Sequence, residues 1–451
     1  MYESPKYFKS SSRPHILMIT NHGVHEWDII PGLPDTGGQN VFVNQFTEAL
    51  VKQGYKITIV NRGGYTHPVS GDLHTGTRYK DENQRILYLD DGCPKFVRKE
   101  DMVEHLPQLT KNLQELLTDE GTSVDLIISH YWDGAKLGVN YNRTLTNPVK
   151  HIWVPHSLGA VKKRNVNPDK WENLHIDERI ANEHDIIAEI DAVAATSATI
   201  RQSLTDDYHW STTPLFLPPC VNPDRYHPRE IGTAHPIWEF LSQHSGLTPE
   251  EIRSRKIIAE VSRTDTTKRK DVLIKAFADI QDQHPDTLLV VTIDRTHKPL
   301  GSELVDLIKF NGIEKNTAIL GSVWDQLPDI YAVTDIYCTP SVMEGFGMSP
   351  QEAAATRVPA VSSDLVPYVT EYLLGEDVET LQYQQIAPAL QVGKGAIVIQ
   401  ADDVPGFARA LDLLLSDEVL RKKMGQSAYE ITIPYFTWDH MVSRFLEKID
   451  S

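Results

Sequence analysis

The chain has 451 residues, of which 40% are hydrophobic and 24% are charged, as in an ordinary globular protein. A single hydrophobic core rarely grows to this length, so we expect two domains. The formal charge is −18 and no long block of Lys or Arg interrupts the acidic excess, which disfavours a nucleic acid partner. No apolar run approaches the ~20 residues that cross a bilayer, so we expect no membrane span.

The N-terminal residues and the cysteines both favour a cytoplasmic protein. Residues 1–14 mix Tyr, Lys, Ser and Pro without the apolar stretch of a secretory signal. The cysteines, Cys93, Cys220 and Cys338, lie far apart and lack the spacing of metal ligands, which suits a reducing compartment. The sequence leaves the oligomeric state open.

Short apolar runs rich in β-formers alternate with amphipathic stretches of helical length, which predicts βα units and an α/β fold with parallel strands. The strands expected in the first half lie at 15–20, 56–61, 124–129, 151–154 and 192–196. Those of the second half lie at 256–261, 287–292, 318–320, 336–339 and 358–362. Two doubly wound domains fit this pattern best.

Proline-rich residues separate the two sets of strands. Pro218, Pro219 and Pro223 supply no ladder donors and cannot continue a helix, so we place the linker at 216–223. The predicted domains are residues 1–220 and 221–435. The remaining residues, 436–451, are predicted to form a last amphipathic helix through Met441 and Phe445.

A Gly-Gly turn follows the first strand. In doubly wound folds ligands bind outside the carboxyl ends of the strands. Gly37 and Gly38 precede Gln39 and a helix through Val43 and Phe46, so backbone amides at the helix start can approach an anion. The spacing is not that of G-x-G-x-x-G, which argues against a nicotinamide cofactor. The alternative is a turn with no ligand.

His156 follows the strand at 151–154, and a basic triplet, 162–164, comes shortly after it. A lone histidine is more often structural, and a basic triplet is usually a solvated face. Both segments nevertheless lie at the carboxyl end of a predicted strand, which makes His156 and the triplet candidates for a ligand site.

Two cations follow the first strand of the second half. Arg263 and Lys268 are a short loop apart, and an Arg fork with a Lys point charge can clamp a diphosphate. The alternative is a solvated loop before a helix. The segment is not a Walker loop, because the glycines that cradle phosphate there are missing.

Glu344 and Glu352 flank a glycine-bearing turn with seven residues between them. One interpretation of Glu352 is a capping box, with Ser349 as N-cap and Pro350 at the first helical position. That box leaves Glu344 unexplained. A carboxylate accepts hydrogen bonds without donating any, which suits sugar hydroxyls.

Taken in chain order, these segments resemble the retaining GT-B glycosyltransferases of the sucrose-phosphate synthase and sucrose synthase type, in glycosyltransferase family 4. The matching segments are Gly37 to Gln39, His130 with Tyr131, His156 to Gly159, Arg179 with Ile180, Pro218 with Pro219, Arg263, Lys268 and the two glutamates. The resemblance implies two Rossmann-like domains with a cleft between them, and a last helix that returns to the N-terminal domain.

The resemblance also implies a nucleotide-sugar donor. Arg263 and Lys268 are then expected to hold its diphosphate, Glu352 the ribose and Glu344 the hexose, with His156 at the reacting centre. The catalytic set is His156, Glu344, Arg263 and Lys268, and the donor site is completed by Gly38, Gly345, Phe346 and Gly347. Family members are thought to pass the acceptor's proton to the leaving diphosphate, so no metal and no obligatory cofactor are expected.

Relatives with phosphorylated acceptors grip the phosphate from the N-terminal domain. The matching acceptor residues in this chain are Gly37, Gln39, Lys99, Tyr131, Ser157, Lys163 and Arg179. The predicted reaction moves glucose or mannose from a UDP-, GDP- or ADP-sugar to a small phosphorylated acceptor such as a sugar phosphate. The alternatives are an unphosphorylated sugar acceptor, an epimerase or phosphorylase of the same architecture, and a catalytically silent sugar-nucleotide-binding protein.

Three places depart from the family pattern. The chain has residues 364–367, Asp-Leu-Val-Pro, where family members often have Gly-Gly. Cys220 and Arg269 also stand where glycine is common.

Overall fold

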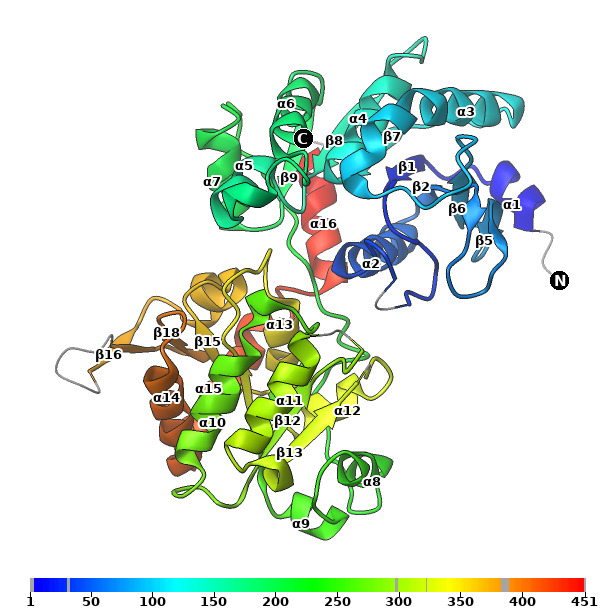
Figure 1. Cartoon of the computed structure of the whole chain (residues 1–451). Helices are drawn as coiled ribbons and strands as arrows, with labels where there is room; N and C mark the ends of the chain where they lie inside the picture. The colour runs from blue at the N-terminus through cyan, green and yellow to red at the C-terminus, as the bar shows by residue number, and fades with distance from the viewer. Residues whose placement is uncertain (1–3, 31–32, 297–298, 322, 383–388, 450–451) are drawn as a thin grey trace. The chain divides into compact units, whose positions relative to one another are not determined.

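The chain folds into two compact units, each built on a parallel sheet. The computed structural model describes residues 4–30, 33–296, 299–321, 323–382 and 389–449. One unit comprises Met1–Pro218 with Met441–Ser451, and the other comprises Pro219–His440 (Figure 1). The predicted α/β class is confirmed.

The first unit holds an eight-stranded sheet of order β10-β9-β8-β7-β1-β2-β6-β5. Only β5 runs antiparallel to its neighbour. All five predicted strands are present, and their ends lie within two residues of the expected positions. The strands are β1 (His15–Ile19), β2 (Lys56–Arg62), β5 (Gly76–Tyr79), β6 (Gln84–Leu89), β7 (Leu126–His130), β8 (Lys150–Val154), β9 (Ala192–Ala195) and β10 (Leu215–Phe216), with a hairpin of β3 (Tyr65–Thr66) and β4 (Leu73–His74) outside the sheet.

Helices cover this sheet. They are α1 (Ser4–Ser10), α2 (Gly38–Lys52), η1 (Lys99–His105), α3 (Leu106–Asp119), α4 (Tyr131–Asn142), α5 (Gly159–Asn165), η2 (Pro168–Lys170), α6 (Ile176–Ile187) and α7 (Ala198–Asp206). The last helix, α16 (Trp438–Ile449), packs on this unit over most of its length. Phe445 meets Phe46 of α2 edge to face with ring centroids 5.5 Å apart, and Lys150 donates to the Ile449 carbonyl.

The second unit also has an eight-stranded sheet, of order β13-β12-β11-β14-β15-β18-β17-β16. Its five predicted strands are confirmed, and β16 and β17 form an antiparallel edge. The strands are β11 (Lys256–Glu260), β12 (Thr287–Thr292), β13 (Thr317–Leu320), β14 (Ile336–Thr339), β15 (Ala360–Ser363), β16 (Glu379–Leu381), β17 (Leu390–Val392) and β18 (Ala396–Ile399).

Helices follow the strands of this sheet as well. They are α8 (Pro236–Gln243), α9 (Pro249–Arg253), η3 (Thr266–Lys268), α10 (Lys270–Ile280), α11 (Leu300–Phe310), η4 (Glu314–Asn316), α12 (Leu327–Val333), α13 (Met348–Ala354), the π-helix η5 (Val369–Leu373), α14 (Val404–Ser416) and α15 (Glu418–Thr432).

Alternating side chains of the second sheet enter two separate cores. Ile258 and Leu289 join one cluster with α10, α11 and α14. Ile257 and Leu288, one position earlier, join the other with α8, α9 and α12. Successive strand residues point to opposite faces, so helices bury both faces of this sheet, as a doubly wound fold requires.

None of the described helices combines the length and the apolar character that a membrane crossing requires.

Phe46 offers a test of how the last helix is held. The ring is fully buried between Phe42 and Phe445. Phe46→Ala is expected to destabilise the chain by roughly 3–5 kcal/mol, because it deletes a buried ring and leaves a cavity. Urea unfolding followed by circular dichroism measures the loss. The matched control is Phe310→Ala, at a position 87% exposed, which should change stability by less than about 0.5 kcal/mol. Equal effects of the two changes would contradict this packing.

Candidate active site

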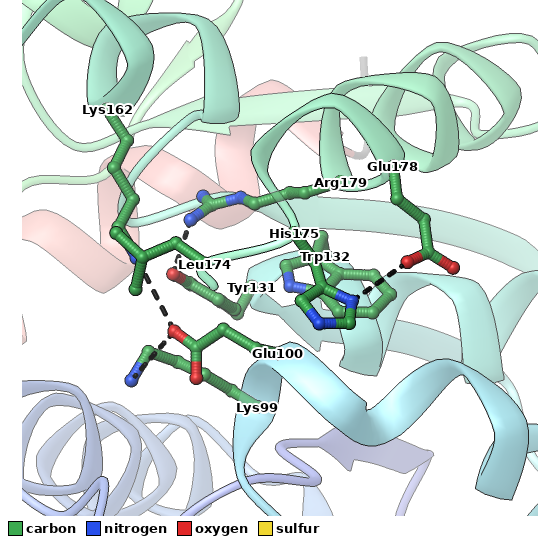
Figure 2. A pocket seen from close by; sticks show the side chains of 9 residues that line it. All are labelled: Lys99, Glu100, Tyr131, Trp132, Lys162, Leu174, His175, Glu178 and Arg179. Carbon is green, nitrogen blue, oxygen red and sulfur yellow. Dashed lines mark hydrogen bonds and ion pairs between the residues drawn. The ribbon is translucent and has the colours of Figure 1, made fainter. Parts of the chain in front are cut away.

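A pocket in the first unit is lined by side chains from five segments of the chain, several of them charged (Figure 2). Three predicted acceptor residues, Lys99, Tyr131 and Arg179, are among those that line it. The full lining is Lys99, Glu100, Tyr131, Trp132, Lys162, Leu174, His175, Glu178 and Arg179. Residues up to 80 positions apart in the chain therefore share one cavity, because η1, α4, α5 and α6 all begin at the carboxyl side of the sheet.

Arg179 organises one wall of this pocket. Its side chain is 4% exposed, and its Nε donates to Glu183 at 2.8 Å. Its two terminal nitrogens donate to the Tyr131 hydroxyl and to the carbonyl and hydroxyl oxygens of Ser157. The guanidinium also lies 4.3 Å from the Tyr131 ring centroid. Ser157 is thus held beside the pocket although it does not line it.

Tyr131 presents its hydroxyl to the pocket as a phenol. Burial raises the pKa of Tyr131, so the group keeps its proton at neutral pH. Since the hydroxyl oxygen accepts from Arg179, its proton is available for a ligand.

Two lysines face the pocket, each beside a carboxylate. The ammonium of Lys99 is paired with Asp35, and Glu100 lies 3.6 Å from Lys99 and 3.5 Å from Lys162. Burial opposes the charge of Lys99, but the bond to Asp35 outweighs it and raises the pKa of that ammonium. Burial lowers the pKa of Lys162, and the neighbouring Arg179 charge lowers it further. An incoming anion can replace these carboxylates.

Lys163, the lysine expected from the sequence, lies elsewhere. Its ammonium is 2.6 Å from Asp177 and 4.8 Å from the Trp171 ring, and it does not line the pocket. Consecutive residues of a helix point about 100° apart, so α5 turns Lys162 to the pocket and Lys163 away from it. Lys162 belongs to the basic triplet that the sequence indicates, although it is not among the expected acceptor residues. The other lining residues that the sequence did not indicate are Glu100, Trp132, Leu174, His175 and Glu178.

The predicted Gly-Gly turn forms the start of α2. Gly37 is the N-cap, and its amide donates to the side chain of Asn40 at 2.9 Å. Gly38 is exposed as the first helical residue. Gln39 donates to the Thr20 hydroxyl at the end of β1. The helix begins where the sequence predicts, with Val43 and Phe46 buried.

His156 stands just after β8, with its backbone in the left-handed region at φ 54°. Its Nε2 is 2.8 Å from Nδ1 of His130, at the end of the neighbouring strand β7. Burial, with a smaller effect from His22, lowers the pKa of His156 to about 3. The ring is therefore neutral at physiological pH.

In the second unit Lys268 and Glu344 form an ion pair of 2.5 Å although they are 76 residues apart. The loops after β11 and β14 are joined by the amide of Val342 and the hydroxyl of Ser341, which both donate to the Thr267 carbonyl. Arg263 is exposed on the first of these loops. The expected diphosphate cations and the expected hexose carboxylate thus share one edge of the second sheet.

The turn between the two glutamates differs from the capping box described above. Helix α13 begins at Met348 with Gly347 as N-cap, at φ 114°. Ser349 donates instead to the carbonyl of Val261 at 3.0 Å, so the capping box is wrong. Phe346 is buried against Tyr368 and Phe436, which fixes Gly345 and the turn.

The freed Glu352 carboxyl accepts from the Tyr331 hydroxyl at 3.3 Å. Burial raises the pKa of Glu352 to about 7, against smaller opposing effects from Tyr331 and Arg225. Arg225, in turn, stacks on Trp324 at 4.4 Å. A partly buried carboxylate beside aromatic groups can accept from ligand hydroxyls.

Residues 364–367 pack against this turn where the family often has Gly-Gly. A Cβ added to Gly347 would meet the Val366 side chain at 2.8 Å, and the carboxylate of Asp364 accepts from the amide of Ala401. Side chains of this loop therefore pack against the turn before α13 and bond the turn after β18.

A further cluster in the first unit, Glu26 with His67 and His74, has ligand-type atoms within 4.8 Å of one another. Nδ1 of His67 accepts from the amides of Val69 and Ser70. The proton of this imidazole is then on Nε2, which faces Glu26 at 3.7 Å. With its lone pair used by the amides, His67 is a polar partner of Glu26 and no metal centre is proposed here.

Two family models match adjacent parts of the chain. The model described as Glycosyltransferase Family 4 matches residues 36–225, and the model described as Glycosyl transferases group 1 matches residues 249–431. Each falls largely within one structural unit.

Curated relatives match over most of their own length. Mannosylfructose-phosphate synthase of Agrobacterium fabrum is 28% identical over 362 residues, or 77% of this chain and 76% of the relative. A D-inositol 3-phosphate glycosyltransferase of Corynebacterium jeikeium is 26% identical over 404 residues, or 88% of each chain.

Solved structures share the fold. Sucrose-phosphate synthase from Thermosynechococcus elongatus superposes with a TM-score of 0.75 at 20% identity, covering 97% of this chain and 98% of its own. WaaG, a glycosyltransferase involved in lipopolysaccharide biosynthesis, gives a TM-score of 0.64 at 12% identity, covering 95% and 98%. The GT-B expectation is confirmed, and the chain belongs to the group 1 glycosyltransferases of family 4, as a hexosyltransferase.

Proposed function

We propose that this hexosyltransferase moves glucose or mannose from a nucleotide sugar to a sugar phosphate or a similar small phosphorylated acceptor, with retention of configuration. The observation that carries the proposal is the pocket of the first unit, where Lys99, Lys162 and Arg179 meet the Tyr131 hydroxyl. The names of both curated relatives include a phosphorylated compound, which supports the same acceptor class.

A phosphate dianion suits this pocket chemically. Three cations and one phenol can donate hydrogen bonds to a ligand, and a phosphate group supplies three acceptor oxygens. The carboxylates of Glu100 and Glu178 also line the pocket. Asp35 and Glu100 compensate the charges of the two lysines. A neutral sugar carries no charge that could replace these two carboxylates. The ion pairs would then stay in place, and the cations would contribute little to the binding of the sugar.

Donor binding belongs to the second unit in this proposal. Arg263 and Lys268 bind the diphosphate, Glu344 the hexose and Glu352 the ribose hydroxyls. As the bond from the anomeric carbon to the diphosphate oxygen breaks, negative charge grows on the diphosphate, and fixed cations stabilise it. The acceptor oxygen bonds the anomeric carbon from the same face, and the diphosphate takes the acceptor's proton. We propose no obligatory metal or cofactor for this step.

Substitutions of two neighbouring lysines of α5 test whether the pocket binds the acceptor phosphate. Lys162→Gln should raise the KM for a sugar phosphate by roughly 10- to 100-fold, because a charged hydrogen bond is lost. Lys163→Gln, one residue further on, should change it less than about twofold, because an exposed ion pair contributes little. Release of nucleoside diphosphate at varied acceptor concentration measures both. If the two variants behaved alike, Lys162 would have no special role.

The donor cations are tested separately. Lys268→Met should lower kcat by roughly 100- to 1,000-fold, the loss typical of one donor to developing charge. It should weaken binding of the nucleoside diphosphate in calorimetry and leave acceptor phosphate binding unchanged. Lys275→Gln, at an exposed pair with Asp271, is the control. A Lys268 variant with unchanged kcat would exclude this lysine from the donor site.

The raised pKa of Glu352 predicts that donor affinity decreases as the pH falls. Only the carboxylate accepts two ribose hydroxyls, so donor affinity should fall about tenfold per pH unit below pH 7, where the group protonates. Glu352→Gln should bind donor weakly with a flat pH profile over this range.

The effect of Glu352 on stability runs the other way, since lower pH favours the folded state at this site. The folded-state pKa lies above the unfolded value, so ionised Glu352 destabilises the fold above pH 7, and this cost disappears as the pH falls toward 4.5. Glu352→Gln should therefore raise the melting temperature at pH 8 and leave it nearly unchanged at pH 4.5. Equal shifts at the two pH values would rule out an ionisation effect at this site.

A further inference from the structure

His156 is one half of a histidine pair. His130 closes β7 and His156 follows β8, and these strands are parallel neighbours in register. The two rings stack with centroids 5.1 Å apart and planes 26° apart, and 2.8 Å separates Nδ1 of His130 from Nε2 of His156. Phe42 of α2 meets both rings in a T-shaped arrangement, with ring centroids 5.9 Å and 4.8 Å apart.

The pair shares one hydrogen-bonding proton, which leaves two arrangements. Burial lowers the pKa of both imidazoles, so each ring is neutral and carries a single N–H. In the first arrangement His130 donates from Nδ1 to Nε2 of His156, and the proton of His156 is on Nδ1. In the second, His156 donates from Nε2, and the proton of His130 is on its own Nε2.

The surroundings of His130 favour the first arrangement. His130 is fully buried, and its Nε2 has no hydrogen-bond partner among the residues that the structure describes. The second arrangement would bury an N–H with no acceptor, which native proteins rarely tolerate. The first arrangement uses every N–H of His130 and leaves only a lone pair without a partner.

The other ring nitrogen of His156 is free to meet a ligand. Across the described part of the chain Nδ1 of His156 makes no hydrogen bond, and it is not among the buried unpaired atoms. The residue is only partly buried, and its left-handed backbone, beside a tight turn from Pro155 to Ser157, fixes the ring direction. A non-glycine residue held in this region is strained, and such strain clusters at functional sites.

We infer that His130 is a positioning residue that holds His156 with its proton on Nδ1, so that His156 offers a hydrogen-bond donor to its ligand. The identity of this ligand rests on the proposed function, in which the donor hexose lies beside His156. A hexose hydroxyl oxygen then accepts from Nδ1 of His156. No lone pair of His156 is left to take the acceptor's proton, which agrees with its passing to the leaving diphosphate.

The tautomer is measured directly by ¹⁵N NMR of histidine-labelled protein, with His156→Gln used to identify the signals. In the wild-type chain Nδ1 of His156 should have the chemical shift of a protonated nitrogen and Nε2 that of an unprotonated one. His130→Phe keeps a ring of similar size and removes the donor, so the proton of His156 should redistribute toward Nε2. His130→Asn returns an N–H donor and should restore the wild-type pattern.

Kinetics provide the second readout. His130→Phe should lower kcat by roughly 10- to 100-fold with the KM for the acceptor unchanged, and His130→Asn should recover most of that loss. The matched control is His151→Asn, since His151 is an equally buried histidine of the same sheet that bonds Ser129 and does not touch His156. It should change stability without moving the His156 signals.

A wild-type His156 protonated on Nε2 would overturn the inference, as would an unchanged tautomer in His130→Phe. If His130→Phe fails to fold, the wild-type spectrum and His130→Asn still decide. A chain with the expected tautomer that transferred no hexose from any nucleotide sugar would refute the proposed function and leave the pairing intact.

Discussion

Parallel strand pairing is the constraint on which both candidate sites depend. In each sheet the central strands run in one direction, so their carboxyl ends meet at one edge and the loops that follow them converge. His130 and His156 are 26 residues apart in the chain and within hydrogen-bond distance for this reason. The same constraint joins Lys268 to Glu344 in the second unit.

In both units, carboxylates neutralise the lysines of the candidate sites. Asp35 and Glu100 neutralise lysines of the pocket, and Glu344 neutralises Lys268. Each cation would otherwise lie partly desolvated without a partner, at a substantial cost. An anionic ligand can exchange with one of these carboxylates and keep the cation paired. A neutral ligand brings no charge for such an exchange.

The sequence predicts the skeleton of this fold well and its side-chain geometry less well. All ten expected strands exist, and most of their residues are buried. Several strands were not predicted, among them β18, although its residues are all apolar and buried. Strand β6 was also missed, and its run contains Arg85, which is buried where it pairs with Glu120 and bonds Thr58. Such compensation comes from distant segments and has no local pattern.

The same limit explains the errors at the candidate site. Residues 162 and 163 are both lysines, so the sequence cannot tell them apart. They differ in the direction in which α5 turns each side chain, since Lys162 faces Glu100 and Lys163 faces Asp177. Ser349 has the spacing of an N-cap, but Gly347 takes that position and the hydroxyl reaches the carbonyl of Val261. In both cases a partner from another segment decides where the side chain points.

Backbone strain links these observations. Asp35, Tyr131, His156 and Arg269 are non-glycine residues with φ between 48° and 63°, and each lies in a loop or helix start beside a candidate ligand residue. Family members commonly have glycine at the position of Arg269, and the left-handed backbone there supplies the reason. Here the cost of the side chain is offset by a 3.0 Å ion pair to Asp271. At Tyr131 and His156 the strained backbone instead aims a phenol at the pocket and an imidazole at its partner His130. Left-handed backbone is not confined to the candidate sites, since His209, Arg357 and Asp402 also adopt it, but at Tyr131 and His156 it sets the direction of a side chain that the proposed reaction uses.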